Sequence, residues 1–216
     1  MFVGHYGVAF IAKAKAKEIP LWQLFVAVQL VDIAWSILVL FGVEKARIIP
    51  GITKSLPLDL YYMPYTHSLV AAVVWSAAAF IVYRVLRPSG ARTAALVLAV
   101  AVLSHWLLDL LVHRPDLPLW DDTSKVGFGL WNYPLPAFLL EGALLVAGLL
   151  LYLRSSVAVS PAAKYSGWGF AAVLLITQAF VVIVQPLPST TFAALLFLGS
   201  YVGLSATAYR VELTRQ

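Results

Sequence analysis

The sequence predicts an all-α, polytopic membrane helix bundle with about six transmembrane helices and one short N-terminal helix. Composition is the first reason: 62% of the 216 residues are hydrophobic and 12% are charged, whereas charged residues make up about a quarter of a soluble domain. The mean hydropathy of +0.88 agrees. The second reason is that six apolar stretches each approach the ~20 residues that a helix needs to cross a bilayer. We therefore expect a single integral membrane domain over residues 1–216.

The apolar stretches predict the spans and one shorter inserted segment. The six spans are Leu21–Gly42, Thr66–Leu86, Thr93–Val112, Pro136–Leu153, Trp168–Gln185 and Thr190–Tyr209. A further apolar stretch, Phe2–Ala12, is too short to cross, because at about 1.5 Å per residue it reaches only the bilayer centre. It is expected to form a re-entrant, partly inserted or interfacial helix.

The basic residues predict the orientation of the bundle. Ten of the fifteen fall on one side of the predicted spans: Lys13, Lys15, Lys17, Arg84, Arg87, Arg92, Arg154, Lys164, Arg210 and Arg215. The other five are spread over two longer loops, 43–65 and 113–135. Because cytoplasmic loops carry the excess of Lys and Arg, we expect both termini in the cytoplasm and the protein in the cytoplasmic (inner) membrane.

Composition also limits the partners and the chemistry. The formal charge of +5 is not gathered into a nucleic-acid patch, so the expected partner is the lipid bilayer and not a nucleic acid. A larger membrane complex is a second partner that the small size allows. The chain has no cysteine, which excludes a disulfide framework and a thiolate metal site.

Three ionisable residues share one face of the third predicted span. In Ser104–Asp116, which reads SHWLLDLLVHRPD, the residues His105, Asp109 and His113 are spaced four apart. On a helix, such residues are rotated by about 40° and rise about 6 Å, so they form one stripe. A His and an Asp four apart can bind one metal ion, while the alternative is a buried hydrogen-bonded pair. His113 lies at the helix end, where an interfacial position is an equal alternative.

Four further ionisable residues are predicted at a similar depth, in the outer half of the bundle. His67 opens the second span, Glu141 lies about two turns into the fourth, and Asp32 lies near the middle of the first. His5, on the N-terminal stretch, reaches a similar level. An ionisable group inside a membrane is a functional-site hypothesis by default. The loop residues Asp116, Asp121 and Asp122 are instead expected to be solvated.

The pattern favours a metal site and a hydrolytic reaction. Histidine plus carboxylate without sulfur is a donor set for zinc, with manganese or iron as alternatives. We expect His5, Asp32, His67, His105, Asp109 and His113 as ligands of a divalent metal. Asp32 or Glu141 would act as the catalytic carboxylate that positions or deprotonates water. A site at this depth favours a lipid or other amphiphilic phosphoester or ester substrate. The alternatives are a proton- or ion-coupled transporter and a non-catalytic subunit of a membrane complex.

The order of these motifs resembles a known family. Gly4-His5, Asp32, Thr66-His67-Ser68 and Ser104-His105 with Asp109 are similar to the LexA-regulated (YdjM-like) inner-membrane metal-dependent hydrolases of bacteria and archaea, over roughly residues 1–145. The ligand order is also similar to that of soluble zinc-dependent phospholipases C, helical enzymes that bind a zinc cluster and cleave phosphodiesters. The resemblance implies the first five ligands above, with His113 and Glu141 as later ones. The phospholipase pattern has a histidine four residues before its glutamate, where this chain has Ala137.

Overall fold

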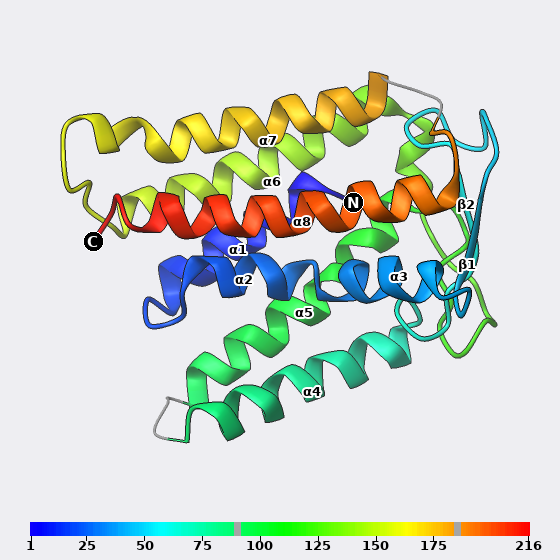
Figure 1. Ribbon diagram of the computed structural model, residues 1–216, viewed down its shortest axis with the longest axis horizontal. Coiled ribbons are helices and arrows are strands. Elements are labelled where there is room, and N and C mark those ends of the chain that lie inside the picture. The colour runs from blue at the N-terminus through cyan, green and yellow to red at the C-terminus, as the bar shows by residue number, and fades with distance from the viewer. Residues whose placement is uncertain (89–91, 184–186) are drawn as a thin grey trace.

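The computed structural model describes residues 1–88, 92–183 and 187–216, and it confirms the all-α bundle (Figure 1). Its helices are α1 (Val3–Lys15), α2 (Leu21–Val28), α3 (Leu30–Leu40), α4 (Leu69–Leu86), α5 (Arg92–Val112), α6 (Pro134–Arg154), α7 (Ser166–Ile183) and α8 (Thr190–Glu212). Two 3₁₀ turns, Leu130–Asn132 and Ala162–Tyr165, precede α6 and α7. In the described part of the chain, five helices are long and apolar enough to cross a membrane, and α2 with α3 would make a sixth span. The predicted end of the fifth span at Gln185 lies outside the described residues.

The first predicted span is not one straight helix, which corrects the sequence-based expectation. α2 ends at Val28 and α3 begins at Leu30, and their axes differ by 55°. Neither proline nor glycine marks the break. Gln29, with φ −112° and ψ 9°, is fully buried there, and its Nε2 donates to the Phe2 carbonyl at 3.3 Å. The break therefore ends a helix in the middle of the bundle, where its last carbonyls have no helical partner.

The N-terminal stretch forms α1 in the interior of the bundle and not an interfacial helix. α1 packs against α2, α5 and α6, and its Val3, Tyr6 and Phe10 are fully buried. A Cβ added to Gly148 of α6 would overlap the backbone of Gly7 in α1. Glycine at both positions thus lets the two helix backbones approach closely. α1 can be short because its surroundings are protein on most sides.

The loop 43–65 contains a small antiparallel hairpin that the sequence did not predict. β1 (Lys45–Ile48) pairs with β2 (Leu58–Tyr62), with Arg47 opposite Asp59 and Ile48 opposite Leu58. The strands are too short for a clear alternating pattern, which is why the sequence indicated only a loop. We call the end of the bundle that carries β1 and β2 the hairpin end.

The opposite end, which we call the basic end, carries the ends of α1, α4 and α6, together with the C-terminal residues (Figure 1). Gln216 lies there and pairs with Val157. Met1 instead lies buried in the interior of the bundle.

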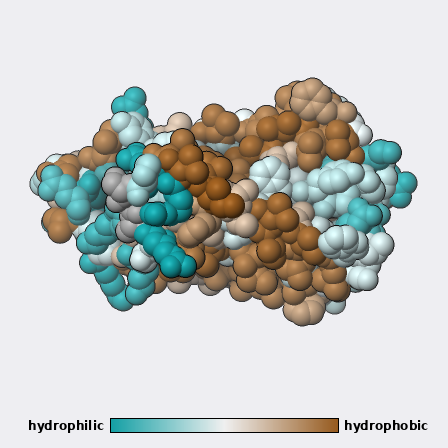
Figure 2. Space-filling model, turned by 90° about the horizontal axis from the view of Figure 1, so that it is seen from below, coloured by the Kyte–Doolittle hydropathy of each residue, from teal (hydrophilic) through white to brown (hydrophobic). Residues whose placement is uncertain are grey.

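The surface agrees with a membrane protein. Figure 2 shows a band of hydrophobic side chains between two more hydrophilic ends. Exposed apolar residues of the candidate spans include Val74 and Val85 of α4 and Ile176 and Phe180 of α7, all more than half exposed. Large apolar side chains gathered on a surface mark an interaction site, and a belt around a helix bundle is typical of lipid contact.

The interior is divided into two parts along the long axis of the bundle. Near the basic end it is an aromatic core, in which Phe25 stacks on Tyr6 and Phe170, and Phe10 stacks on Tyr152. The half toward the hairpin end contains a cluster of buried ionisable side chains. The apolar half supplies the packing that holds the helices in register, and the polar half is the place to look for chemistry.

The close approach of α1 to α6 gives a direct test of the interior position of α1. We expect Gly148→Ala to lower the stability of the protein by about 1–3 kcal/mol, because the added methyl group overlaps the Gly7 backbone. The matched control is Gly203→Ala in α8, where an added Cβ meets no atom within 4 Å. Thermal unfolding in detergent measures both. Equal midpoints for the two variants would contradict the packing described here.

Candidate metal centre

All four histidines of the chain lie together in the hairpin half of the interior, beside three carboxylates. Each is buried or nearly so, and they come from different elements: His5 from α1, Asp32 from the first turn of α3, His67 from the residue pair before α4, His105 and Asp109 from α5, His113 from the residue after α5, and Glu141 from α6. The structure thus brings together the residues that the sequence placed at one depth.

Asp109 is the centre of the cluster. Its Oδ2 lies 3.0 Å from His105 Nε2, 3.6 Å from His113 Nε2 and 3.8 Å from His67 Nε2. Its Oδ1 lies 3.1 Å from His5 Nε2 and also accepts a hydrogen bond from the Met1 amine. The spacing of four that the sequence showed for His105, Asp109 and His113 therefore places all three side chains on one stripe, as predicted.

Asp32 faces the same histidines from the other side. Its Oδ1 lies 3.2 Å from His67 Nε2 and 3.6 Å from His105 Nε2. Its Oδ2 accepts a hydrogen bond from the Tyr201 hydroxyl of α8 at 2.9 Å. The two aspartates thus lie on either side of the Nε2 atoms of His67 and His105.

Each of the aspartate-to-histidine distances is one that two ligands of the same tetrahedral metal ion would have. Ligand atoms at about 2.0–2.1 Å from a tetrahedral zinc ion lie roughly 3.3 Å from one another. The four aspartate-to-histidine separations among Asp32, Asp109, His67 and His105 range from 3.0 to 3.8 Å. Two groups of three residues bring their ligand atoms within 4.8 Å of one another, namely Asp32, His67 and His105, and His5, His105 and Asp109. The two groups share His105.

The break between α2 and α3 sets the orientation of His105. Its Nδ1 lies 2.7 Å from the carbonyl oxygen of Val28, the last residue of α2. A carbonyl can only accept, so Nδ1 carries the hydrogen and the Nε2 of a neutral ring has a free lone pair. That Nε2 has no hydrogen-bond donor or acceptor of its own among the described residues and is aimed at Asp109 and Asp32.

Residues outside the cluster position His67. Ser68 caps α4 by accepting from the Ala71 N–H, and the Trp106 indole donates to the His67 carbonyl at 2.9 Å. His67 Nδ1 lies 2.7 Å from the Thr66 hydroxyl, which itself donates to Glu44 at 2.6 Å. Since the Thr66 hydrogen is engaged with Glu44, His67 Nδ1 donates and its Nε2 is unprotonated in the neutral ring.

Glu44 is the outermost member of this relay, in the loop after α3. Its carboxylate accepts from the N–H groups of Tyr65 and Thr66 as well as from the Thr66 hydroxyl. Burial raises the pKa of Glu44 above its ordinary value, while His67 and these donors act in the opposite direction. All three donors point at the Glu44 oxygens, so the Glu44 carboxylate acts as a hydrogen-bond acceptor in this arrangement.

His113 is held in the same way by Asp116, which corrects one prediction. Asp116 was expected to be solvated in the outer loop, but it is 5% exposed and its Oδ1 accepts from His113 Nδ1 at 2.9 Å. The reason is that the chain turns back directly after α5, and Arg114 donates to the other Asp116 oxygen at 3.2 Å. The ring of Trp131 lies against His113, with centroids 4.3 Å apart. His113 is therefore an interior residue and not an interfacial one.

The orientation of these histidine rings creates a site that favours a bound cation. Three imidazoles, those of His67, His105 and His113, use Nδ1–H for outward hydrogen bonds and turn Nε2 toward carboxylate oxygens. A lone pair facing an anionic oxygen is repulsive unless a cation or an extra proton lies between them. Histidines held through Nδ1 by a carboxylate or a carbonyl are the usual surroundings of metal-binding imidazoles. These buried His and Asp residues could therefore hold a metal ion.

His5 and Glu141 differ from the other members. The His5 ring stacks on His105 at 3.9 Å, and its Nδ1 has no hydrogen-bond partner among the described residues. Glu141 accepts from the N–H groups of Phe2 and Gly4 at 2.7 and 3.2 Å, and from Gln178 Nε2 at 3.1 Å. Glu141 thus binds the start of α1, consistent with the affinity of helix N-termini for negative charge. It lies beside the cluster, outside both groups of ligands.

The sequence did not indicate several residues that support the site. Tyr201 and Gln178 are polar residues inside apolar spans, and that isolated polarity is the signal that could have found them. Glu44 and the Val28 carbonyl gave no such signal, because their partners depend on how the loops and the helix break fold.

The chain matches no protein-family model, and neither the curated proteins nor the solved structures contain a match to it. The site is therefore interpreted from its own geometry.

The Thr66 relay gives a test of how the site is held. We expect Thr66→Val to weaken zinc binding by about 10–100-fold, because His67 loses the partner that fixes its Nδ1–H tautomer. Thr207→Val is the matched control, since the Thr207 hydroxyl bonds only within the exposed face of α8. Competition with a chromophoric chelator measures both affinities. If the two variants bind zinc equally well, Thr66 does not orient a ligand.

Proposed function

We propose that the protein is a membrane-embedded, metal-dependent hydrolase that acts on a lipid or another amphiphilic phosphoester or ester. The observation that carries this proposal is the convergence of three Nε2 atoms, from histidines whose Nδ1 atoms are bonded elsewhere, on the carboxylates of Asp32 and Asp109. Burial of so many ionisable groups in a membrane bundle is costly, and such groups mark function.

The donor set identifies the class of metal. Asp32, His67 and His105 would form one set of ligands and His5, His105 and Asp109 a second, with His113 beside Asp109. Nitrogen and oxygen donors without sulfur suit zinc, and manganese or iron accept the same donors. When bound, such an ion would lower the pKa of a water molecule and polarise the scissile group.

The two aspartates have different surroundings, and this suggests different roles. The Asp109 side chain is 2% exposed and contacts all four histidines, so it serves to hold the cluster together. The Asp32 side chain is 15% exposed and lines a cavity, and the Tyr201 hydroxyl fixes one of its oxygens. Asp32 is therefore placed to orient water and accept its proton. Glu141 lines the same cavity beside Gln178 and is the second carboxylate within reach of a bound molecule.

The motifs that resemble the LexA-regulated inner-membrane hydrolases and the zinc-dependent phospholipases C support the same proposal. Their shared elements, Gly4-His5, Asp32, Thr66-His67-Ser68 and Ser104-His105 with Asp109, are the residues that the fold gathers. The proposal has three further parts. The protein would belong to the first family, it would cleave phosphodiesters as the second family does, and it would lie in the cytoplasmic membrane.

The packing of the other half of the interior favours a hydrolase over a transporter. Within the described residues, the polar cluster gives way toward the basic end to the stacked rings of Tyr6, Phe25 and Phe170, with centroids 4.5 and 5.4 Å apart. A proton or ion relay needs polar groups along its path. A site closed on that side suits a reaction that starts and ends in the same half of the membrane.

Metal analysis tests the proposal. We expect zinc, manganese or iron to co-purify with the protein, and His105→Gln combined with Asp109→Asn to lose most of it, because both ligand groups contain His105. Asp122→Asn is the control, since Asp122 pairs with Lys125 in the loop away from the cluster. Release of fatty acid or headgroup from a bacterial lipid extract should stop with a chelator and return with zinc. Metal content unaffected by the double substitution would overturn the proposal.

A further inference from the structure

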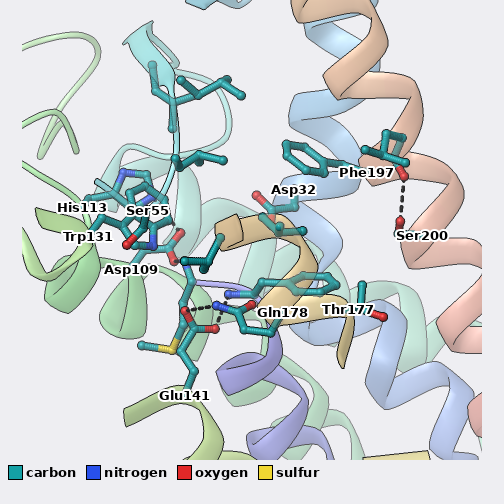
Figure 3. A pocket seen from close by; sticks show the side chains of 18 of the residues that line it. Asp32, Ser55, Asp109, His113, Trp131, Glu141, Thr177, Gln178, Phe197 and Ser200 are labelled. Atoms are coloured by element: carbon teal, nitrogen blue, oxygen red, sulfur yellow. Dashed lines mark hydrogen bonds and ion pairs between the residues drawn. The ribbon is translucent and has the colours of Figure 1, made fainter. Parts of the chain in front are cut away.

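A cavity of about 140 Å³ adjoins the cluster and extends between α7 and α8. Figure 3 shows Asp109, His113 and Glu141 toward one side of it, and Thr177, Phe197 and Ser200 toward the other. The cavity is therefore lined by ionisable groups where it meets the cluster, and by apolar side chains with the two hydroxyls of Thr177 and Ser200 where it passes between the two helices.

The hairpin forms one wall of this cavity. Leu58 and Leu60 of β2 line it and are only 3% and 7% exposed. The loop between the strands is tied down, because the Ser55 N–H donates to the Trp131 carbonyl at 3.0 Å. Ser55, Leu56 and Trp131 line the cavity as well. On the side of the hairpin end, folded chain thus lies between the cavity and solvent.

The wall formed by α7 and α8 is different. Phe180 of α7 and Leu196 of α8 line the cavity and yet are 59% and 41% exposed. At these two side chains the cavity reaches the outer face of the bundle, and they form its rim. Both helices are long and apolar enough to span a membrane, so the rim lies on two candidate membrane spans.

The lining selects for one kind of molecule. Among the described lining residues there is no Lys or Arg that would bind the charge of a water-soluble anion, whereas Phe180, Val181, Val182, Leu196 and Phe197 form an apolar passage. A hydrocarbon chain moving from lipid into such a passage exchanges one apolar environment for another. A polar group at the end of that chain would come to the Asp32 end of the cavity.

We propose that the opening between α7 and α8 admits one acyl chain of a membrane lipid sideways, and that the ester or phosphoester group of this lipid comes to the His and carboxylate cluster. The inference rests on the proposed hydrolase function and specifies its substrate class and entry route. The substrate is a membrane lipid bound by one chain, and a water-soluble ester would not be selected.

Photolabelling tests the route without requiring turnover. The probe is a phosphatidylethanolamine with a diazirine near the ester carbonyl of one acyl chain, in liposomes of phosphatidylethanolamine and phosphatidylglycerol. Illumination should label Trp35, Leu58 and Leu60, which line the cavity but are at most 7% exposed. A lipid that stays on the outer surface cannot reach them, so mass spectrometry of these residues distinguishes an entered chain from surface lipid.

Two tryptophan substitutions provide the comparison. Ser200→Trp should reduce labelling of Trp35, Leu58 and Leu60 by about tenfold, because the large indole fills the passage. Val202→Trp, two residues further along α8 and 62% exposed, should label like the unchanged protein. Thr177→Trp fills the same passage from the α7 side. It is the variant to use if the Ser200→Trp protein does not retain its metal. Equal labelling in the filled and control variants, or no labelling of the three residues in the unchanged protein, would overturn the route.

The outcome also separates this inference from the proposed function. Labelling of the three cavity residues in an unchanged protein that contains no metal would leave the lipid route standing and remove the hydrolase. Bound metal without labelling of the three cavity residues would remove the lipid route alone.

Discussion

The burial of the Asp109 carboxylate is the constraint on which the rest of the site depends. An ionised carboxylate inside a membrane bundle loses several kcal/mol of hydration, which must be offset by cations and hydrogen-bond donors. Here the Met1 amine donates to it, and the Nε2 atoms of the four histidines lie within 3.8 Å of its oxygens, around the place where a bound cation would offset its charge. The interior position of α1, the end of α5 and the segment before α4 each deliver one of these groups. The unusual features of the fold are thus the features that bring the amine and the candidate metal ligands to one point.

A second set of residues makes that arrangement specific. Each of three histidines donates its Nδ1 hydrogen to a fixed acceptor. These acceptors are the Val28 carbonyl for His105, the Thr66 hydroxyl for His67 and the Asp116 carboxylate for His113, and the bonds turn the Nε2 atoms inward. Hydrogen bonds alone would be satisfied by other orientations of the rings. The shared direction of the three Nε2 atoms is what distinguishes a binding site for a cation from a buried polar network.

Sequence reasoning predicted the spans and the stripe of His105, Asp109 and His113, because apolar length and a spacing of four depend only on local helix geometry. It did not predict the break at Gln29, since neither proline nor glycine marks it and the break depends on contacts such as that with Phe2. Nor did it predict that Asp116 would be buried or that Tyr201 would reach Asp32, because both depend on how distant segments pack. The interior position of α1 follows from glycine contacts with α6 that are visible only in three dimensions.

The central claim is that His67, His105 and His113 are held as Nδ1–H tautomers with Nε2 available to a metal ion. Nitrogen-15 NMR of protein labelled at histidine, in lipid nanodiscs with and without zinc, tests this directly, and the four histidines allow each signal to be assigned by substitution. The account predicts Nδ1–H for these three residues in both states and a zinc-dependent shift at their Nε2 atoms, largest for His67 and His105. Protonated Nε2 atoms on these residues, or spectra that zinc leaves unchanged, would contradict it.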